Sequence, residues 1–223
     1  MNTINPLSKG FVFSRKPLVT EPMIRSLLAR LKQKDGAAKE PIIDFIRHRL
    51  DRRYIQPLQN ISVGFGSGFL MIAASCLLIE ALQSFHKGLN NTKGKGMSQK
   101  AFMDFFERKE AKRFFPKFRN YFPILEQKNG KGEKFEVCTF YKHIRCGVLH
   151  QAETTGGYRI VRDKSHLFDE DKNGKSINAD KFVKALGHFL NEYFKNLSSD
   201  PIDSDIWKNA VKKITHICDN CRT

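Results

Sequence analysis

The sequence predicts an all-α protein, a bundle of about six to seven helices with a small β-hairpin insertion. Several separate segments repeat apolar residues at steps of three and four, which is typical of helices with one face turned to a core. A strand-like run is confined to the short stretch that follows Gly157. A chain of 223 residues can bury a substantial core, so we expect a single domain over residues 1–223.

The charge of the chain narrows the class of partner. Lysine and arginine number 39 against 23 aspartate and glutamate residues, which gives a net charge of +16. Such a balance favours nucleic acid as the partner. An anionic membrane surface is the alternative, but the positive charge is dispersed and does not border a lipid-inserting stretch. Residues 1–10 contain no apolar run that could act as a secretory signal, so we expect a cytoplasmic protein.

The first two helices are marked by prolines and glycines. A helix begins around Glu21, with proline next to it in the first turn, and is expected to end near Gly36. A second helix begins at Pro41 and ends or kinks near Pro57.

The most apolar segment is residues 65–89, which we interpret as the central helix. Its uninterrupted apolar part, residues 69–79, is broken only by Ser75 and is too short for a membrane span of about 20 residues. We therefore expect no membrane partner. Glu80 follows at once, and a carboxylate on an apolar helix seeks a cation such as Arg145, unless it simply faces the solvent.

A loop and an aromatic, basic stretch follow the central helix. Residues 88–98 are rich in glycine, asparagine and lysine, and Ser98 is expected to cap the next helix. Residues 99–122 interleave eight aromatic residues with arginine and lysine. Aromatic rings can stack on unpaired bases, although phenylalanine at helical spacing more often belongs to a core. The basic candidates for binding RNA are Arg113, Lys117, Arg119 and, further on, Lys142.

The segment 135–157 is the centre of the functional prediction. Its apolar residues at helical spacing predict a helix with one buried face: Val137, Phe140, Ile144 and Val148. Arg145 lies within this apolar run, where a guanidinium needs an acidic partner or a bound anion. His150 follows at the end of the run, and an imidazole is well suited to move protons near neutral pH.

Arg145 and His150, within FYKHIRCGVLHQAETTGG, resemble the Arg-x(4–6)-His motif of the HEPN superfamily. The resemblance implies a HEPN-like helical bundle, cleavage of RNA without a metal, and a homodimer with a composite active site. It also implies a role as a toxin or antiviral defence effector, with an antitoxin or regulatory protein as a further partner. Many members have a polar residue directly after the arginine, whereas this chain has Cys146.

The spacing alone is a weak signal, because about one match is expected by chance in a chain of this composition. A second match joins Arg159 to His166, but these residues lie in what reads as strand and turn. We therefore rejected that pair on its context. For Arg145 and His150 the alternative is a pair that only stabilises the bundle.

Helix geometry restricts how Arg145 and His150 can cooperate. Five residues correspond to about 140° around a straight α-helix, so the two side chains diverge unless the helix loosens at Gly147 or ends before His150. Two copies of the motif meeting in a homodimer would also bring them together. His143 shares the face of His150 if the helix persists, which makes it a candidate auxiliary proton carrier or a plain surface histidine.

The remainder of the chain offers weak metal signals. Residues 169–180 fit most of a calcium-loop pattern, but a hairpin through Asn173 and Gly174 is the better interpretation. Asn178 should cap a helix from about Ala179 to Asn196, and Ser204 should open a last helix. The C-terminal His216, Cys218 and Cys221 lack the second ligand pair of a usual zinc site, so we expect no cofactor.

Three functions remain open from sequence alone. The first is an endoribonuclease in which Arg145 and His150 are catalytic, with Glu80 and His143 as auxiliary residues. The second is a non-catalytic HEPN module that binds RNA or a protein, which Cys146 favours. The third is a protein regulated by a metal at residues 169–180 or at the C-terminal cysteines.

Overall fold

The computed structural model describes residues 12–15, 18–64 and 66–220. The expectations for residues 1–10, Phe65 and Cys221 lie outside these ranges. The described helices are α1 (Glu21–Lys32), α2 (Lys39–Leu50), α3 (Gln56–Gln59), α4 (Ser67–Lys87), α5 (Met97–Glu107), α6 (Lys109–Phe114), α7 (Phe118–Tyr121), α8 (Cys146–Gln151), α9 (Ala179–Ser199) and α10 (Asp205–Asn220). The described strands are β1 (Val12–Arg15), β2 (Leu18–Thr20), β3 (Ile124–Lys128), β4 (Lys134–Cys138), β5 (Tyr158–Val161), β6 (Phe168–Asp171) and β7 (Gly174–Asn178).

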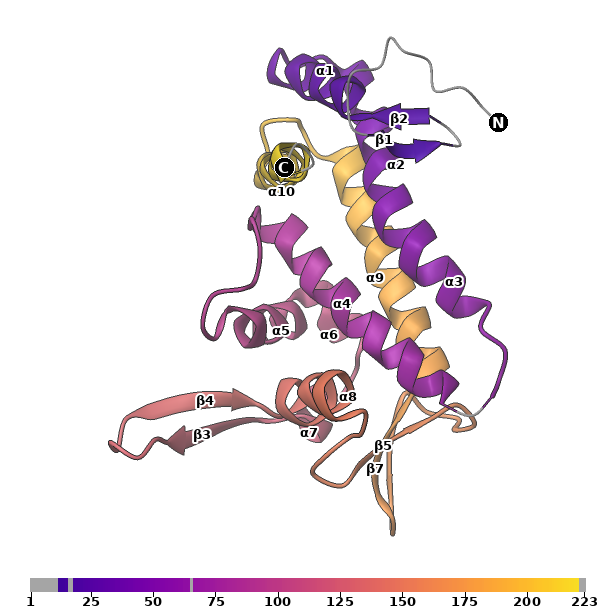
Figure 1. The fold of residues 1–223 in the computed structure, drawn as a ribbon, viewed down its shortest axis with the longest axis vertical. Helices are drawn as coiled ribbons and strands as arrows, with labels where there is room; N and C mark the ends of the chain where they lie inside the picture. Colours follow the sequence, from indigo (N-terminus) through magenta and orange to yellow (C-terminus); the bar gives the residue numbers. More distant parts are fainter. Residues whose placement is uncertain (1–11, 16–17, 65, 221–223) are drawn as a thin grey trace. The chain divides into compact units, whose positions relative to one another are not determined.

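The predicted all-α class is wrong, because the described chain carries three small sheets beside its helices. The expected hairpin is present as antiparallel β6 and β7, but β5 pairs in parallel with β7 and makes a three-stranded sheet. Strands β1 and β2 form a separate antiparallel pair near the start of the chain. The fold is therefore mixed, with helices in the majority (Figure 1).

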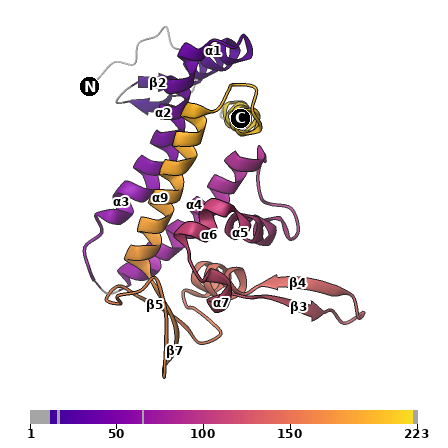
Figure 2. The same ribbon diagram turned by 180° about the vertical axis from the view of Figure 1, so that it is seen from behind.

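Strands β3 and β4 form an antiparallel pair before Arg145, and β4 stands where the sequence predicted the start of the helix that carries Val137. Their register pairs Leu125 with Val137 and Gln127 with Phe135. Val137 stands three residues before Phe140, which is a helical spacing, but it lies on β4. The five residues of β4 do not alternate between buried and exposed, so nothing in this segment indicated a strand. Figures 1 and 2 show this hairpin extending away from α7 and α8.

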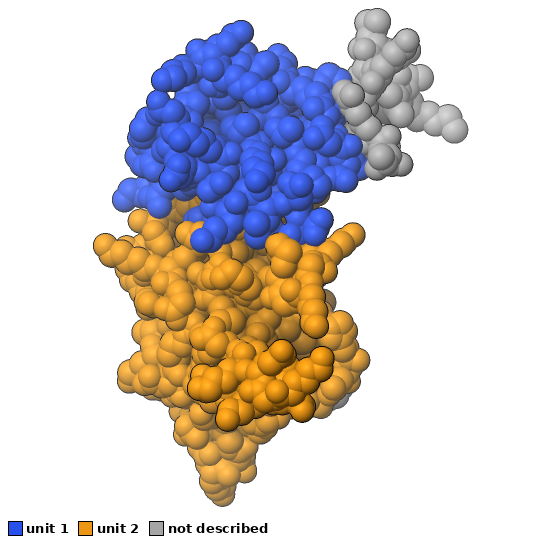
Figure 3. All heavy atoms as spheres, turned by 90° about the vertical axis from the view of Figure 1, so that its left-hand side faces the viewer, with its two compact units in different colours: residues 1–47, 84–91, 194–223 blue, residues 48–83, 92–193 orange. Residues whose placement is uncertain are grey.

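The described residues group into two compact units, coloured separately in Figure 3. Unit 1 contains residues 1–47, 84–91 and 194–223, and unit 2 contains residues 48–83 and 92–193. The expectation of one domain over the whole chain stays a prediction.

Unit 1 is built on the packing of α1 against α10. Ile24, Leu28 and Leu31 are buried on α1, and Trp207 is buried on α10, where its indole Nε1 donates a hydrogen bond to the carbonyl of Leu197 at 2.9 Å. The predicted first helix ends at Lys32, earlier than Gly36.

Unit 2 has a core of phenylalanines that holds the segment around Arg145. The buried rings include Phe102, Phe105, Phe106, Phe115, Phe118, Phe122, Phe140, Phe182 and Phe189. The ring of Phe140 stacks on Phe182 of α9 with centroids 5.7 Å apart. The interpretation of the aromatic stretch as core is therefore confirmed for these phenylalanines. The burial of Phe140 also fixes the start of the segment that carries Arg145 and His150.

The second helix changes and ends near Pro57 as predicted, whereas the start of α5 differs from the prediction. A π-helical segment, Asp51–Ile55, joins α2 to α3 just before Pro57. Proline lacks an N–H and crowds the carbonyl four residues back, which accounts for a widened turn at this point. Helix α5 begins at Met97 after Gly96 in a left-handed conformation (φ 73°), so Ser98 is not its cap.

Helices α4 and α9 are the longest of the described helices. Helix α4 is long and apolar enough to cross a membrane by length and composition alone, but 61% of its most apolar window is buried in the protein. Asn178 caps α9 as predicted, since its Oδ1 accepts a hydrogen bond from the N–H of Lys181 at 2.9 Å.

Candidate functional site

Arg145 and His150 meet within one copy of the chain. Nη1 of Arg145 lies 3.0 Å from Nε2 of His150. Arg145 ends a π-helical segment, Tyr141–Arg145, and His150 lies on α8. The loosened segment thus ends at Arg145, and the helix neither loosens at Gly147 nor ends before His150, since it continues one residue past His150. A π-turn inside a helix is a rare feature that often marks a functional site.

Glu80 of α4 holds the guanidinium from the other side, which confirms the pairing expected from sequence. Its Oε1 accepts a hydrogen bond from Nε of Arg145 at 3.1 Å and lies 3.1 Å from Nη2. The two side chains are only 16% and 14% exposed. Burial opposes the charge on Arg145, but the nearby Glu80 and Tyr141 outweigh it and raise the pKa of the guanidinium.

Thr92 completes this arrangement and was missed by sequence reasoning. Its hydroxyl donates a hydrogen bond to Oε2 of Glu80 at 2.8 Å. Thr92 lies in a loop rich in glycine and asparagine, where nothing in the local pattern marks one polar residue above the others. Glu80 is thus oriented by Thr92 while it orients Arg145.

The arrangement leaves Arg145 able to bind an anion. A guanidinium has five N–H groups, and the contacts with Glu80 and His150 use three of them. Its Cζ also lies 5.3 Å from the ring centroid of Tyr141, which supports the plane of the group. Because Arg145 can only donate, its contact with Nε2 of His150 is a hydrogen bond in the tautomer whose Nε2 accepts.

The loop after α8 packs back on the motif segment at Gly147. A side chain at Gly147 would place Cβ only 2.5 Å from the carbonyl oxygen of Glu153. Beside this contact, the N–H of Thr155 donates a hydrogen bond to the carbonyl of His143 at 3.1 Å. Glycine is therefore required between Arg145 and His150 for close approach of this loop.

His143 faces the same loop. Its Nδ1 lies 2.8 Å from the hydroxyl of Thr155, and its ring centroid is 5.8 Å from that of Tyr158. Burial and the charge of Lys142 lower the pKa of His143. No described interaction joins His143 to Arg145 or to His150, so its auxiliary role stays a prediction.

The four predicted RNA-binding residues fall into two classes. Arg113 lies 3.2 Å from Glu192, and both Nε and Nη2 of Arg119 donate to Glu107, so acidic neighbours offset these two charges. Lys117 and Lys142 are exposed and form no ion pair within the described ranges.

The arginine of the rejected motif match and the aspartates of the calcium-loop pattern are both used in ion pairs. Arg159 donates to Asp171 at 2.6 Å, and Asp180 accepts from Arg162 at 2.6 Å, so these carboxylates serve ion pairs. Within the described residues, no three His, Cys, Asp or Glu side chains gather in a group that could hold a metal ion. Cys218 is buried on α10.

Comparisons with protein-family models, with curated proteins and with solved structures found no match. A functional conclusion therefore depends on the geometry of Arg145, His150 and Glu80 and on the chemistry that these groups can perform.

Proposed function

We propose that the protein is a metal-independent endoribonuclease that uses Arg145 and His150. The observation that carries the proposal is the 3.0 Å contact between Nη1 of Arg145 and Nε2 of His150, with Glu80 behind the guanidinium. A charged fork of donors and an imidazole nitrogen lie 3.0 Å apart. These are the two groups that cleavage by the ribose 2′-hydroxyl requires.

The reaction follows from the roles of the two side chains. A phosphate of the RNA would bind the two unused N–H groups of Arg145 and compete with His150 for Nη1. Nε2 of His150 would then accept the proton of the 2′-hydroxyl as the 2′-oxygen attacks phosphorus. The bond from phosphorus to the 5′-oxygen breaks, and protonated His150 or water supplies the proton to that oxygen. The products are a 2′,3′-cyclic phosphate and a 5′-hydroxyl.

Glu80 acts through Arg145 in this scheme. It fixes the orientation of the guanidinium by two contacts, while Thr92 fixes Glu80. Such support matters because a displacement of about 1 Å can reduce the rate of an enzyme about a hundredfold.

The biological role is proposed from the resemblance alone. The phrase around Arg145 and His150 resembles the HEPN motif, and active HEPN proteins often serve as toxins or defence effectors. We therefore propose RNA as the substrate and an antitoxin or other regulatory protein as a further partner.

A homodimer is also proposed, and the exposed face of α4 supports it. Leu70 and Leu77 are 59% and 47% exposed and lie seven residues apart, on the same side of α4. A hollow of about 430 Å³ is lined by Leu70, Ala73 and Val148 among others. A second copy covering this face would bring two Arg145–His150 pairs close together. Light scattering should give a dimer mass for the wild type and a monomer mass for Leu77→Glu.

The test of the nuclease is cleavage of RNA in EDTA. Wild-type protein should produce fragments that end in 2′,3′-cyclic phosphate, and His150→Ala should produce about a hundredfold fewer per unit time. His216→Ala is the matched control, because it removes an imidazole from α10 in unit 1. Equal cleavage by His150→Ala and wild type, with both proteins folded, would contradict the proposal.

A non-catalytic RNA-binding module is the second candidate, and Cys146 directly after Arg145 favours it. In that case wild type and His150→Ala would bind RNA equally and leave it intact. Expression of both proteins in bacteria separates the candidates further, because only a nuclease should slow growth and degrade total RNA.

A further inference from the structure

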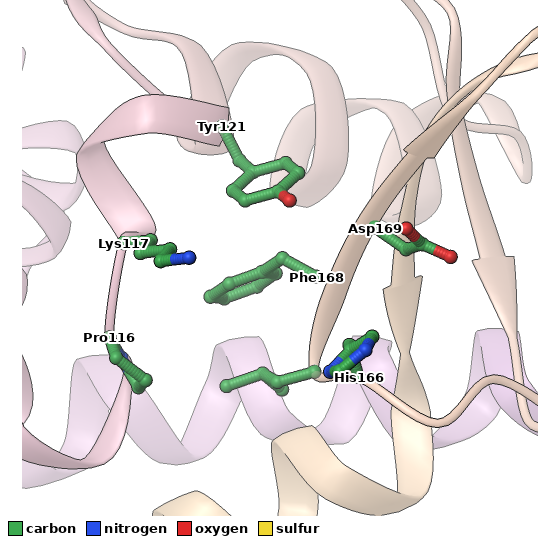
Figure 4. A pocket seen from close by; sticks show the side chains of 7 residues that line it. Pro116, Lys117, Tyr121, His166, Phe168 and Asp169 are labelled. Carbon is green, nitrogen blue, oxygen red and sulfur yellow. The ribbon is translucent and has the colours of Figure 1, made fainter.

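A pocket of about 320 Å³ lies in unit 2 between the turn that precedes α7 and the start of β6. Its walls are formed by Pro116, Lys117, Tyr121, His166, Leu167, Phe168 and Asp169. Figure 4 shows Lys117 entering from one wall and His166 from the other, with the ring of Phe168 between them. None of the residues in this pocket takes part in the Arg145–His150 contact.

The polar side chains that line the pocket are Lys117, His166 and Asp169. The side chains of Lys117 and His166 are exposed, and neither side chain forms an ion pair or hydrogen bond within the described ranges. Asp169 differs, because its carboxylate lies 3.9 Å from Nζ of Lys164. The pocket therefore presents an ammonium group and an imidazole without side-chain partners in the described ranges, beside a carboxylate that lies 3.9 Å from one lysine.

The apolar part of the pocket is aromatic. The rings of Tyr121 and Phe168 lie 5.5 Å apart, and Tyr121 remains partly exposed. The backbone carbonyl of Tyr121 accepts a hydrogen bond from the hydroxyl of Tyr158 at 2.7 Å, so its position is fixed independently of its side chain. The ring of Tyr158 in turn contacts His143 of the π-helical segment. The side chain of Tyr158 thus contacts both Tyr121 of the pocket and His143 of the π-helical segment.

Lys117 is held in an unfavourable backbone conformation. Its φ of 60° lies in the left-handed region, which non-glycine residues adopt rarely. A glycine would suit this position better. The lysine therefore costs the backbone some strain, and its side chain lines the wall of the pocket.

We infer that this pocket binds one unpaired nucleotide of the RNA, with the base against Tyr121 and the phosphate on Lys117 and His166. The inference rests on the proposed function for the identity of the ligand. Single-stranded RNA is commonly held by bases stacked on aromatic rings and by cations on the backbone. A pocket of this volume accepts a ligand of about nucleotide size. Asp169 would accept a hydrogen bond from an exocyclic amino group, so adenine, guanine and cytosine are favoured over uracil.

The experiment measures binding of a fluorescent single-stranded 2′-O-methyl oligonucleotide, which the proposed reaction cannot cleave, by anisotropy. Lys117→Gly and Tyr121→Leu should each weaken binding by about tenfold, while Tyr121→Phe, which keeps the ring, should bind as wild type does. Lys172→Gly is the matched control, because it removes an exposed lysine of the same unit from the turn between β6 and β7. Lys117→Gly should melt at the same temperature as wild type or higher, because glycine relieves the left-handed backbone.

The results separate this inference from the proposed nuclease. Unchanged binding by Lys117→Gly and Tyr121→Leu would overturn the pocket, whether or not the wild type cleaves RNA. Equal losses for Lys117→Gly and Lys172→Gly would also overturn it, because a general effect of charge would explain both. Weaker binding by the pocket variants in a protein that never cleaves RNA would retain the pocket and refute the nuclease.

Discussion

Arg145 and Arg159 are each followed by a histidine at a spacing that fits the same motif, but their surroundings differ. Arg145 contacts His150 and is held by Glu80, and both members of the ion pair are largely buried. Arg159 pairs with Asp171, and these side chains are 34% and 31% exposed. Arg145 ends a π-helical segment and His150 lies on α8, which follows it directly. Arg159 lies on β5, and His166 lies in the loop before β6. Spacing in sequence therefore does not decide by itself how an arginine is used, because the partners that surround each arginine differ.

The largest effect should separate the two arginines in RNA cleavage. Arg145→Ala should reduce the rate by about 10²–10³, because it removes the donors that stabilise charge on the phosphate. Arg159→Ala should leave the rate within about twofold, since its guanidinium serves Asp171. Single-turnover rates at saturating protein measure the difference. Similar losses for both variants would show that general positive charge, and not the Arg145–His150 contact, supports the reaction.

Loss of the carboxylate that pairs with Arg145 should destabilise the protein more than loss of the carboxylate that pairs with Arg159. Glu80→Gln leaves a largely buried guanidinium without its counter-charge and should lower the free energy of unfolding by about 2–4 kcal/mol. Asp171→Asn removes a partner from an ion pair near the surface and should have a much smaller effect. Urea unfolding of both variants gives the comparison. A larger loss for Asp171→Asn would mean that the burial around Arg145 does not matter for stability.

Gly147 offers a test of the backbone between Arg145 and His150. Gly147→Ala would force the loop at Glu153 away from α8 and should lower the free energy of unfolding by about 1–3 kcal/mol. Gly187→Ala on α9 is the matched control, because the new Cβ would meet its nearest neighbour, a side-chain atom of Ile55, at 3.4 Å. Helix propensity favours alanine there by up to about 1 kcal/mol. Equal thermal shifts for the two variants would contradict the close approach at Gly147.

The smallest effects should appear in the dependence of stability on pH. The pKa of His143 is lowered in the folded protein, so the unfolded chain binds more protons below pH 6.5, and stability should fall as the pH drops through that range. Hydrogen bonds from Arg159 hold the pKa of Asp171 at about 2, so its contribution is complete above the ordinary value of about 3.9 and is lost as pH falls towards 2. His143→Gln should flatten the first slope and Asp171→Asn the second. Unfolding midpoints in urea between pH 7.5 and 2.5 provide the check.

Sequence patterns predicted the long helices well because each buries one continuous apolar face. The start of α9 after Asn178 and the extent of α4 followed from capping and apolar length alone. Strands β3 and β4 could not be predicted in this way, since Val137 stands at a spacing that suits a helix with Phe140. A short hairpin with exposed residues has no burial pattern strong enough to overrule that spacing.

The sequence indicated Arg145, His150 and Glu80 as members of the candidate site, but it did not indicate how the backbone brings them together. An arginine in an apolar run required a counter-charge, and Glu80 was a suitable carboxylate on an apolar helix. The π-turn before Arg145 could not be predicted, because it arises from how the segment packs after Phe140 and has no signature in residue type. Thr92 and the pocket at Lys117 depend on contacts between segments distant in sequence, which local patterns do not encode.

The most direct measurement uses an RNA oligonucleotide in which a single nucleotide is ribose and all the others are 2′-deoxy. In EDTA, wild-type protein should cut only on the 3′ side of that ribose and leave a 2′,3′-cyclic phosphate, while His150→Ala should leave the strand intact. Cleavage at deoxy positions, or equal cleavage by His150→Ala, would contradict the assignment of Arg145 and His150 as the reacting pair.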